Sequence, residues 1–589
     1  MSGLGLVLNI AKTALSTQQY GIDVTGHNIA NVNNPSYSRQ SPVIEAKEPA
    51  SYGRILLGQG VDTTNVVRAT DRFIEQQLRE QKSNELAFEE MEQHMKVLEG
   101  YLNENSQTSI SALLSDFWNL WHDISNNPAG SAERVALYEH GSLVSEKFNG
   151  LEADLLQLET DLTGAVNFGV SRINEITGEI ADINTQIVGI EASKVANDLR
   201  DKRTALVSEL AEYINIKSFE QSNGSLTIIT AKGCVLIQGN ESYDLEMGGA
   251  AGDRVTWRSS GNAIVDITDY ISSGKLGGWL TMRDEVIAKC GLDLNALAKE
   301  FIWAINNQHS QGVGLNLFEP DSTLTGTYLT STDLDALDFG SEIQFIADGF
   351  KFWIEDRTAP ANPVMNAVSI DLSGLNGSSS LADVATAINN QIAAAGLAGV
   401  TASVSGNAIQ FTAGSDYAFG FSDDTSNILA ALGVNTFFQG AGSGSMELNP
   451  VLHDKDYIAA AKIEADGSYA SGDNTNALAI VDLQHTSTQI SQWTCDRING
   501  NTQGTVTTTL EHYYHGLVGS MGTTSSSISR GRDFNEVLVS QLSEIRDAIS
   551  AVSLDEEMTN LMKFQHAYAA AAKLITVADE MLDKLLSTK

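Results

Sequence analysis

The chain has 589 residues, which is long for a single hydrophobic core and predicts several domains. It contains 74 acidic and 36 basic residues, for a formal net charge of −38. This charge argues against nucleic acid or an anionic membrane surface as a partner, because both are polyanions. No apolar run reaches about 18 residues, so the sequence predicts no membrane-spanning helix. Cys234, Cys290 and Cys495 are odd in number and far apart, which gives neither a disulfide framework nor a metal-binding spacing.

The amino-terminal segment places apolar residues at alternating spacings of three and four positions. This spacing predicts a helix with one apolar face, which must pack against another helix or against a neighbouring molecule. The apolar positions are Leu4, Leu8, Ala11, Leu15, Ile22, Ile29 and Val32, and Gln18 and Thr25 lie on the same face. We predict that this face is one half of an assembly interface. An ordinary helical hairpin that closes a globular domain fits the same spacing.

A polar turn from Asn31 to Gln40 follows this helix. Pro35 disfavours a helical conformation at Asn34, and asparagines are common at helix ends and in tight turns, so the helix should end here. Residues 42–67 contain short alternating segments and glycines, which predict extended loops or a small hairpin.

Long helical segments make up the next part of the chain. Helical spacing resumes near Thr70 and continues through residues 110–124. The longest periodic region runs from Ser131 to about Ala192. Such a length without an internal proline predicts a rod-like helical bundle rather than a compact enzyme core. A further helix is expected over residues 197–216.

Two regions change to the period of two that is typical of strands. The first lies within residues 226–267, and a helix over about residues 282–307 follows it. The second lies within residues 316–454, which are rich in Gly, Ser, Ala, Asn and Thr and contain one predicted helix at about residues 381–395. We predict a folded, β-rich insertion there.

The last part of the chain is expected to be helical again, over residues 476–498 and from about Gln503. Residues 519–529 are rich in Ser, Gly and Thr, which predicts a hinge. The final helix carries a second apolar face with a regular spacing of three and four, which predicts the other half of the assembly interface. Its positions are Leu561, Phe564, Tyr568, Ala571, Ile575, Ala578, Leu582 and Leu585.

Sequence signals for catalysis are weak. Ser553 to Glu556 fits a capping box, which is favoured over an acid–base cluster at Asp555 to Glu557. His512 and His515 have the spacing of two metal ligands, but the sequence offers no evident third ligand. No phosphate-binding loop and no nucleophile elbow is recognisable. We therefore predict that the protein is not an enzyme and has no catalytic residue, cofactor or metal ion.

Together these patterns predict an α+β multidomain fold in which the two chain ends travel together. The expected domains are a terminal coiled-coil assembly domain of residues 1–69 and 525–589, a rod-like helical domain of residues 70–215, 275–315 and 455–524, a small β-rich segment of residues 216–274, and a β-rich variable outer insertion of residues 316–454.

Sequence blocks at both chain ends carry a family resemblance. His27 to Tyr37 ends a helix in Ala-Asn and continues into a Pro-containing turn, with Asn34 and Ser36 where the family pattern has Thr and Gly. Leu554 to Tyr568 contains Leu-Asp-Glu-Glu-Met, Asn-Leu, Phe-Gln and Tyr. These blocks resemble the axial proteins of the bacterial flagellum, the family of rod, hook and hook-associated proteins. The continuation through Ser38 to Gln40 is similar to the hook-associated members.

Further matches to this family lie inside the chain. They are Leu199 to Arg203, Arg283 with Asp284, and Ile305 to Gly312. The resemblance thus covers about residues 1–315 and 475–589, and the insertion between them looks like the variable outer domains of such proteins. The turn motif that the resemblance implies consists of Asn31, Asn33, Pro35, Tyr37 and Arg39.

The resemblance implies a structural protein that polymerises at the junction between hook and filament and connects the two. Terminal helices in this family are implied to fold on assembly around a central export channel. Type III export needs no cleaved signal peptide, so the absence of a secretory signal is compatible with an extracellular location. The implied partners are further copies of the chain, the hook protein, the next hook-associated junction protein, and an export chaperone on the final helix.

Other functions remain open on the sequence. A hook or rod protein is disfavoured by Ser38 to Gln40 and by Leu554 to Met558. An extracellular adhesin or hydrolase would act through the insertion at residues 316–454, where a pocket with convergent polar groups would favour it. A cytoplasmic coiled-coil scaffold would leave Asn33 to Tyr37 without a role.

Overall fold

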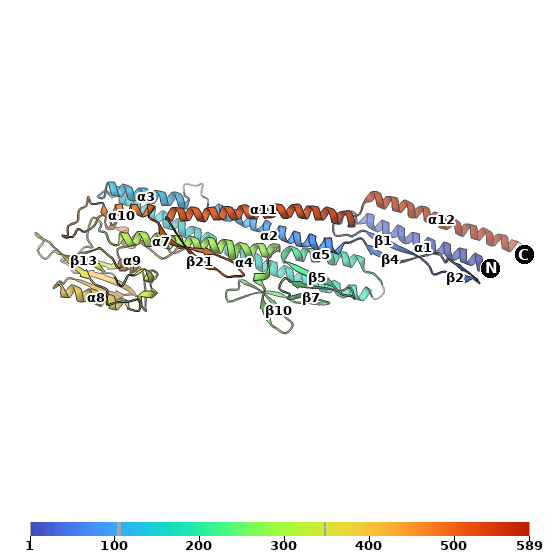
Figure 1. Cartoon of the computed structure of the whole chain (residues 1–589), viewed down its shortest axis with the longest axis horizontal. Coiled ribbons are helices and arrows are strands. Elements are labelled where there is room, and N and C mark those ends of the chain that lie inside the picture. The colour runs from blue at the N-terminus through green and yellow to red at the C-terminus, as the bar shows by residue number, and fades with distance from the viewer. Residues whose placement is uncertain (1, 53, 103–107, 192–193, 347–348, 588–589) are drawn as a thin grey trace. The chain divides into compact units, whose positions relative to one another are not determined.

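The computed structural model describes residues 2–52, 54–102, 108–191, 194–346 and 349–587 (Figure 1). Residue contacts group the chain into two compact units. The first unit holds residues 1–93, 162–282 and 526–589, and the second holds residues 94–161 and 283–525. Helices and strands occur in both units, so the predicted α+β multidomain class is confirmed. The finer domain boundaries stay a prediction.

The two terminal helices form an antiparallel pair in the first unit. α1 (Ser2–Ala30) and α12 (Leu554–Ser587) lie side by side, and the two chain ends are at the same end of this pair (Figure 1). Asn28 is hydrogen-bonded to Glu557, and further along the pair Gly21 faces Phe564, which fixes the antiparallel direction. The two predicted terminal helices therefore exist and pack against each other within one chain.

A hairpin follows α1 and packs against it. β1 (Gln40–Ala46) pairs antiparallel with β4 (Val61–Arg68), and β2 (Ala50–Tyr52) pairs with β3 (Ile55–Leu57). Gly60 has a φ of +95° and approaches α1 so closely that a Cβ there would lie 2.4 Å from Thr13 Oγ1. Only glycine fits both conditions. The small hairpin predicted over residues 42–67 is confirmed.

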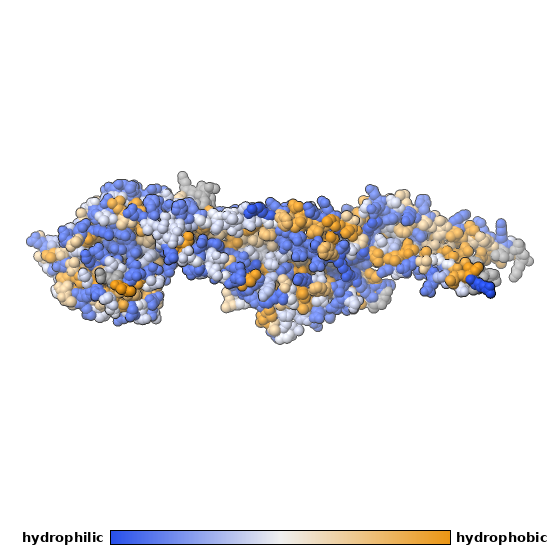
Figure 2. Space-filling model, viewed as in Figure 1, coloured by the Kyte–Doolittle hydropathy of each residue, from blue (hydrophilic) through white to orange (hydrophobic). Residues whose placement is uncertain are grey.

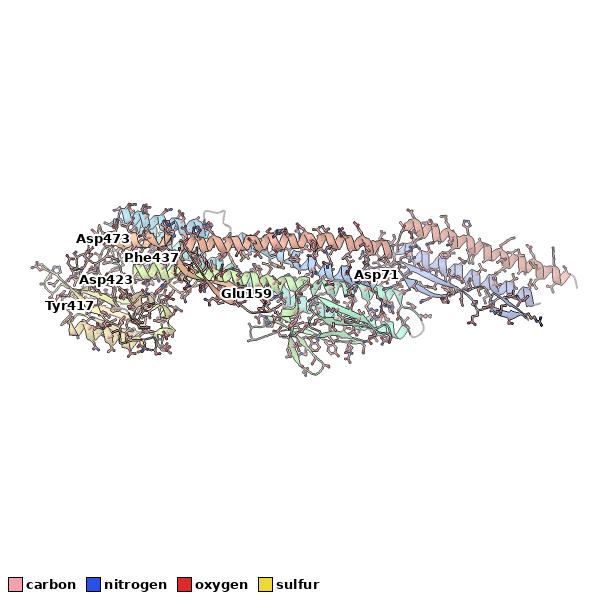
Figure 3. All side chains as sticks on the ribbon, viewed as in Figure 1. Asp71, Glu159, Tyr417, Asp423, Phe437 and Asp473 are labelled. Carbon is pink, nitrogen blue, oxygen red and sulfur yellow. The ribbon has the colours of Figure 1, made fainter. Side chains whose placement is uncertain are left out.

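Long helices contribute residues to both units. α2 (Arg72–Leu102) begins after Asp71, whose carboxylate accepts the backbone N–H of Phe73 at 2.9 Å and so satisfies a free donor of the helix end (Figure 3). α4 (Ser131–Glu191) has 61 residues, as its periodicity predicts. Its apolar stripe is buried from Val144 to Ile187. These helices were correctly predicted because an uninterrupted stripe is the strongest helical signal.

The first unit also contains two small antiparallel sheets and two shorter helices, α5 (Asn197–Tyr213) and α6 (Gly274–Thr281). The strand orders are β5-β6-β7-β8 and β11-β10-β9. The predicted strands within residues 226–267 are confirmed. The strands in that range are β6 (Leu226–Thr230), β7 (Val235–Gln238), β8 (Glu241–Ser242), β9 (Leu245–Gly248), β10 (Arg254–Arg258) and β11 (Ile264–Asp266), and β5 (Ile216–Glu220) precedes it.

The sequence block Leu199 to Arg203 fastens α5 to its neighbours. Arg200 donates to Glu191 of α4 and to Glu220 of β5, each at 2.6 Å. Arg203 is buried and donates to Asn184 Oδ1 at 2.9 Å. A buried guanidinium is tolerated only when such acceptors surround it. This block is therefore structural in the first unit.

The second unit has an aromatic core. The ring of Phe117 meets Phe301 at a centroid distance of 5.3 Å and Phe437 at 5.8 Å, both edge to face, and all three side chains are buried. Edge-to-face pairs add about 0.5–1.5 kcal/mol each beyond the burial of their area. The helices around this core are α3 (Ile110–Asn126), the first part of α4, α7 (Ala288–His309) and α10 (Thr475–Asp482), with a π-helical turn, Met282–Ile287, before α7.

The β-rich region within residues 316–454 is folded as predicted. Its main sheets have the orders β14-β13-β17 and β12-β16-β15. The predicted helix is α8 (Leu381–Ala394), which begins with a capping box between Ser380 and Asp383. The strands are β12 (Thr323–Thr325), β13 (Phe350–Asp356), β14 (Val364–Ile370), β15 (Val400–Ser405), β16 (Ala408–Ala413) and β17 (Tyr417–Ser422), followed by the short α9 (Ile428–Ala431), β18 (Phe438–Gln439) and β19 (Glu447–Leu448).

The block Ile305 to Gly312 at the end of α7 binds backbone groups of this β-rich region. Asn306 Oδ1 accepts the backbone N–H of Phe438 at 2.8 Å. The ring of His309 is fully buried. Its Nδ1 lies 2.8 Å from the carbonyl oxygen of Asn435, and its Nε2 accepts the N–H of Ala459 at 2.9 Å. Both ring nitrogens are therefore used by a neutral histidine.

Two secondary-structure predictions were wrong. Residues 476–498 are helical only in α10 and the short 3-10 helix Leu483–His485 that follows it. A hairpin of β20 (Thr488–Thr494) and β21 (Thr502–Thr508) comes next, because these threonine-rich segments alternate and suit a strand. The hinge predicted at residues 519–529 lies inside the continuous helix α11 (Leu510–Ser550). Leu517, Met521 and Ile528 are buried at helical spacing, and their packing outweighs the low helix propensity of Gly and Ser.

We expect the second unit to lose stability in mild acid through His309. Burial lowers the pKa of His309 to about 4, whereas the unfolded chain has a pKa near 6.5. A lowered pKa in the folded state gives stability that is present above about pH 6.5 and is lost as the pH falls to about 4, by roughly 3 kcal/mol in total. Urea unfolding of the full chain across this range measures the loss.

His309→Gln is the matched variant, because glutamine does not titrate. It should be less stable than the wild type near neutral pH but lack this part of the pH dependence. An equal pH slope in both proteins would assign the acid loss to other groups.

Candidate assembly site at the chain termini

The predicted apolar faces of α1 and α12 lie at the contact between the two helices, where most of their residues are buried or partly buried. On α1, Ala11 is fully buried, and Leu4, Leu8, Leu15, Ile22 and Ile29 are partly buried; Val32, also predicted for this face, lies in the turn after α1 and is partly buried. On α12, Ala571 and Ala578 are buried, Leu561, Phe564, Ile575 and Leu582 are partly buried, and Tyr568 is 40% exposed. The side chain of Leu585 lies outside the described part of the chain. Their role in assembly stays a prediction.

The sequence pattern missed three of the buried residues of α1, Thr17, Gly21 and Asn28. Thr17, Gly21, Thr25 and Asn28 are all buried, although only Thr25 was assigned to the face. A Cβ on Gly21 would lie 2.7 Å from the ring of Phe564, so the two helices approach closely at this glycine. Small and polar residues carry no signal in a search for apolar periodicity. The contact between the helices therefore depends on close approach as well as on apolar side chains.

Asn28 is the centre of a buried polar cluster at the end of α1. Its Nδ2 donates to the carbonyl oxygen of Gln40 at 2.9 Å and to Glu557 Oε2 at 3.0 Å. Its Oδ1 accepts the N–H of Gln40 at 3.0 Å and the hydroxyl of Tyr37 at 2.7 Å. The amide thus uses both donor hydrogens and both acceptor sites. Any replacement would leave at least one buried group without a partner.

Glu557 joins the amino-terminal turn to α12. Its side chain is 2% exposed, and Arg39 Nε donates to its Oε1 at 2.8 Å. The other carboxylate near Arg39 is Glu556, at 2.8 Å from Nη1 and 61% exposed. Glu556, interpreted from the sequence as part of a capping box, thus has a tertiary partner. The turn motif and the Leu-Asp-Glu-Glu-Met block, which resemble the same family, are bonded to each other.

The turn itself is ordered by the same cluster. The hydroxyl of Tyr37 also lies 3.1 Å from His27 Nδ1, and Asn31 Nδ2 donates to the carbonyl oxygen of His27 at 3.0 Å. Burial raises the pKa of Tyr37 above its ordinary value, so the phenol remains a donor at physiological pH. Asn33 and Pro35 are exposed, and Pro35 lines a groove of about 850 Å³ beside α2, α5 and α11.

A second set of bonds ties the turn and the hairpin to α5. Arg68 donates to Asp201 Oδ1 at 2.7 Å, and the backbone N–H of Ser38 donates to Asp201 Oδ2 at 3.4 Å. Gln40 Nε2 donates to Asp198 Oδ1 at 3.0 Å. Burial raises the pKa of Asp201, while the charge of Arg68 acts in the opposite direction. Residues of α5 were not predicted to contact the turn, because no local pattern links positions so distant in sequence.

Large apolar side chains remain exposed along the terminal helix pair and its hairpin. Met562 of α12 is 52% exposed, and Leu56 of the β2–β3 hairpin is 69% exposed. Figure 2 shows apolar residues over the part of the molecule that holds α1, α12 and β2. Exposed clusters of this kind mark surfaces that bind other proteins. The other exposed members are Val7, Tyr20, Ile44, Ile55, Leu57, Leu554, Met558, Leu574, Met581 and Leu586.

Within the described residues, no group of three or more His, Cys, Asp or Glu side chains could hold a metal ion. Among the helices of the same residues, none combines the length and the hydropathy that crossing a membrane requires. The chemistry of the termini is thus apolar contact around a buried polar cluster.

Comparison with known proteins gives matches at both ends and in the middle of the chain. A family model described as the helical domain of the flagellar hook-associated protein FlgK matches residues 95–321, and a model of the C-terminal part of the flagellar basal body rod FlgEFG proteins matches residues 548–588. Flagellar hook-associated protein 1 of Bacillus subtilis (strain 168) is 25% identical over 624 residues, covering 100% of this chain and 99% of the relative. The predicted resemblance is confirmed.

Other relatives agree with this result. Flagellar hook-associated protein 1 of Salmonella typhimurium (strain LT2) is 24% identical over 614 residues, covering 99% of this chain and 100% of the relative. A solved structure titled as the flagellar hook junction protein FlgK from Burkholderia pseudomallei has a TM-score of 0.51 at 16% identity, covers 81% of this chain and 100% of that chain, and supports the fold. The matches support a structural, hook-associated protein of the flagellum.

We expect Glu557→Gln to release the terminal pair from the turn. The change removes a buried charge that Arg39 and Asn28 both face, and hydrogen bonds to charged groups contribute roughly 1.5–3 kcal/mol each. Limited proteolysis of the purified chain should cut near the turn and α12 faster than in the wild type.

Glu556→Gln is the matched control, because Glu556 is 61% exposed and pairs with the same arginine. Exposed pairs contribute about 0–1 kcal/mol, so this variant should behave like the wild type. Equal protection of the termini in Glu557→Gln and Glu556→Gln would show that the buried carboxylate does not hold the pair.

Proposed function

We propose that this chain polymerises in a short zone between the hook and the filament of the bacterial flagellum and connects them. The supporting observation is the exposed apolar surface of the terminal pair and of the β2–β3 hairpin, since contact with neighbouring copies would cover it. The names of full-length relatives and of the structural neighbour fit this position. Copies of the chain, the hook protein and the next hook-associated junction protein are the proposed neighbours.

The terminal helices complete their folding when these neighbours are present. The buried positions between α1 and α12 include Ala11, Gly21, Ala571 and Ala578, which remove little apolar area from water. Fixing the backbone costs about 1–2 kcal/mol per residue, so a pair whose large apolar residues are only partly buried gains little by itself. The large apolar side chains on its outer flanks supply the missing area in the polymer.

Before assembly, the same exposed apolar surface must be shielded from water by another protein. Met558 and Met562 are four positions apart on α12 and about half exposed, and methionine adapts its shape to apolar grooves. A helix with such a row is a suitable ligand for a grooved export chaperone. We place the working protein outside the cell, exported by the flagellar apparatus without a cleaved signal.

Deleting the gene should leave bare hooks and release unpolymerised flagellin into the medium, because no adaptor would join the two tubes. Negative-stain electron microscopy of the cells and an immunoblot of the medium measure both effects. Expression of the wild-type chain from a plasmid should restore filaments. Filaments of normal number and length on the deletion strain would contradict the junction role.

A triple variant tests the outer surface directly. Met558→Asp, Met562→Asp and Met581→Asp place charges on side chains that are 49%, 52% and 49% exposed in the single chain. Circular dichroism of the purified variant should match the wild type, whereas filaments should be lost from about nine cells in ten or more, because an uncompensated charge in an apolar contact is costly.

The triple variant Met558→Leu, Met562→Leu and Met581→Leu is the control, since it keeps apolar side chains at the same positions and adds no charge. It should restore filaments to the deletion strain. Normal filaments with the triple aspartate variant would mean that the outer flank of α12 is not an assembly surface.

A further inference from the structure

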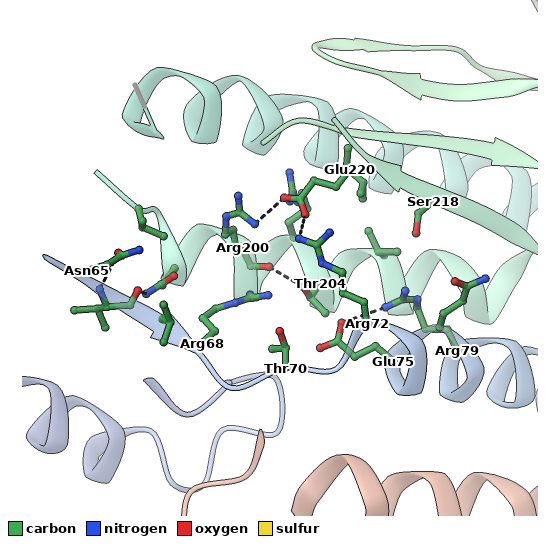
Figure 4. Close-up of a pocket in the computed structure, with 18 residues that line it drawn as sticks. Asn65, Arg68, Thr70, Arg72, Glu75, Arg79, Arg200, Thr204, Ser218 and Glu220 are labelled. Atoms are coloured by element: carbon green, nitrogen blue, oxygen red, sulfur yellow. Dashed lines mark hydrogen bonds and ion pairs between the residues drawn. The ribbon is translucent and has the colours of Figure 1, made fainter. Parts of the chain in front are cut away.

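An arginine-lined pocket lies in the first unit, away from the terminal pair. It has a volume of about 370 Å³ and is lined by residues from the end of β4, the start of α2, α5 and β5 (Figure 4). Its five arginines contrast with the formal net charge of −38 for the whole chain. They are Arg68, Arg72, Arg79, Arg200 and Arg203.

Four of these arginines have carboxylate partners at hydrogen-bond distance in their own chain. Glu220 accepts hydrogen bonds from Arg72, Arg200 and Arg203, and Arg68 donates to Asp201. Figure 4 shows Glu220 and Arg200 on the side of the pocket opposite to Glu75. These four side chains are explained by the fold, because each holds two elements together.

Arg79 differs from the other four. Its side chain is only 17% exposed, and its nearest carboxylate, Glu75 one helical turn earlier, is 3.9 Å away. Within the described residues, its guanidinium makes no hydrogen bond, although it carries five N–H donors. Burial lowers the pKa of Arg79 and raises the pKa of Glu75, so neither group is well solvated. Because Arg79 lines the pocket, its open donors face the pocket space and can bind an acceptor from outside the chain.

We propose that this pocket binds an oxyanion, a phosphate or a carboxylate, through the guanidinium of Arg79. The planar fork of an arginine matches two oxygens of such a group. Thr70, Gln76 and Ser218 also line the pocket and place further polar side chains there. The oxyanion is either a free solute or a carboxylate side chain of a second copy of the chain. The second source rests on the proposed polymerisation, whereas binding of a free anion does not.

Isothermal titration of the purified full chain with inorganic phosphate and with citrate, at constant ionic strength in chloride, tests the site. Arg79→Gln should weaken binding by about tenfold or more, because it removes charge-assisted hydrogen bonds. Glu75→Gln should strengthen it several-fold, because it removes the nearest negative charge. Opposite effects of two neighbours on α2 are not expected from general loss of folding.

Arg254→Gln is the control, since Arg254 is an ion-paired arginine of the same unit that does not line the pocket. It should leave the affinities unchanged. The proposal is overturned if neither phosphate nor citrate binds the wild type saturably, or if Arg79→Gln binds them as well as the wild type.

A second experiment identifies the source of the oxyanion. Assembly of the purified chain is followed by light scattering with and without phosphate at equal ionic strength. If a carboxylate of a second copy occupies the site, phosphate slows wild-type assembly and Arg79→Gln assembles slowly even without phosphate. If the ligand is a free solute, phosphate binds without slowing assembly. A chain that binds phosphate but never assembles would contradict the proposed function. The oxyanion site would still stand in that case, with a free anion as its ligand.

Discussion

A buried carboxylate holds the two ends of this chain together. Glu557 is 2% exposed, and a charge in such a position is tolerated only when donors surround it. Asn28 on α1 and Arg39 in the following turn supply those donors, from residues more than 500 positions earlier in the chain. The ends cannot separate without leaving this charge unpaired. The blocks that resemble flagellar hook-associated proteins at the two termini are thus the two sides of one contact.

This polar cluster and the apolar faces have different effects on stability. The cluster fixes which residues of α1 and α12 face each other, because Asn28 uses every donor and acceptor it has. The buried residues of the contact between the helices include the small residues Gly21, Ala571 and Ala578, and the large apolar residues of the two faces are only partly buried. A pair that is precisely aligned but gains little from burial has a stability that depends on what covers its outer flanks. Such conditional stability is what the proposed folding of the terminal helices on assembly requires.

Apolar periodicity predicted the helices but only part of the site. It gave α1, α4 and α12, and the alternation of β-branched residues gave the strands of the insertion. It failed at Thr17, Gly21 and Asn28, whose burial comes from close approach and hydrogen bonding rather than from apolar character. Composition misled at residues 519–529, where packing of Met521 outweighs the glycines. The contact between Asp201 and Arg68 is tertiary and has no local signal.

The acidic net charge bears on the proposed assembly. Copies with a formal net charge of −38 repel one another, but screening weakens this beyond about 8 Å at physiological ionic strength. Contact between copies then depends on local basic groups rather than on net charge. Arg68 and Arg200 are already paired with carboxylates of their own chain and so offer little attraction to a neighbour. Arg79 keeps its hydrogen-bond donors open within the described residues, so its charge is available to an acceptor from outside.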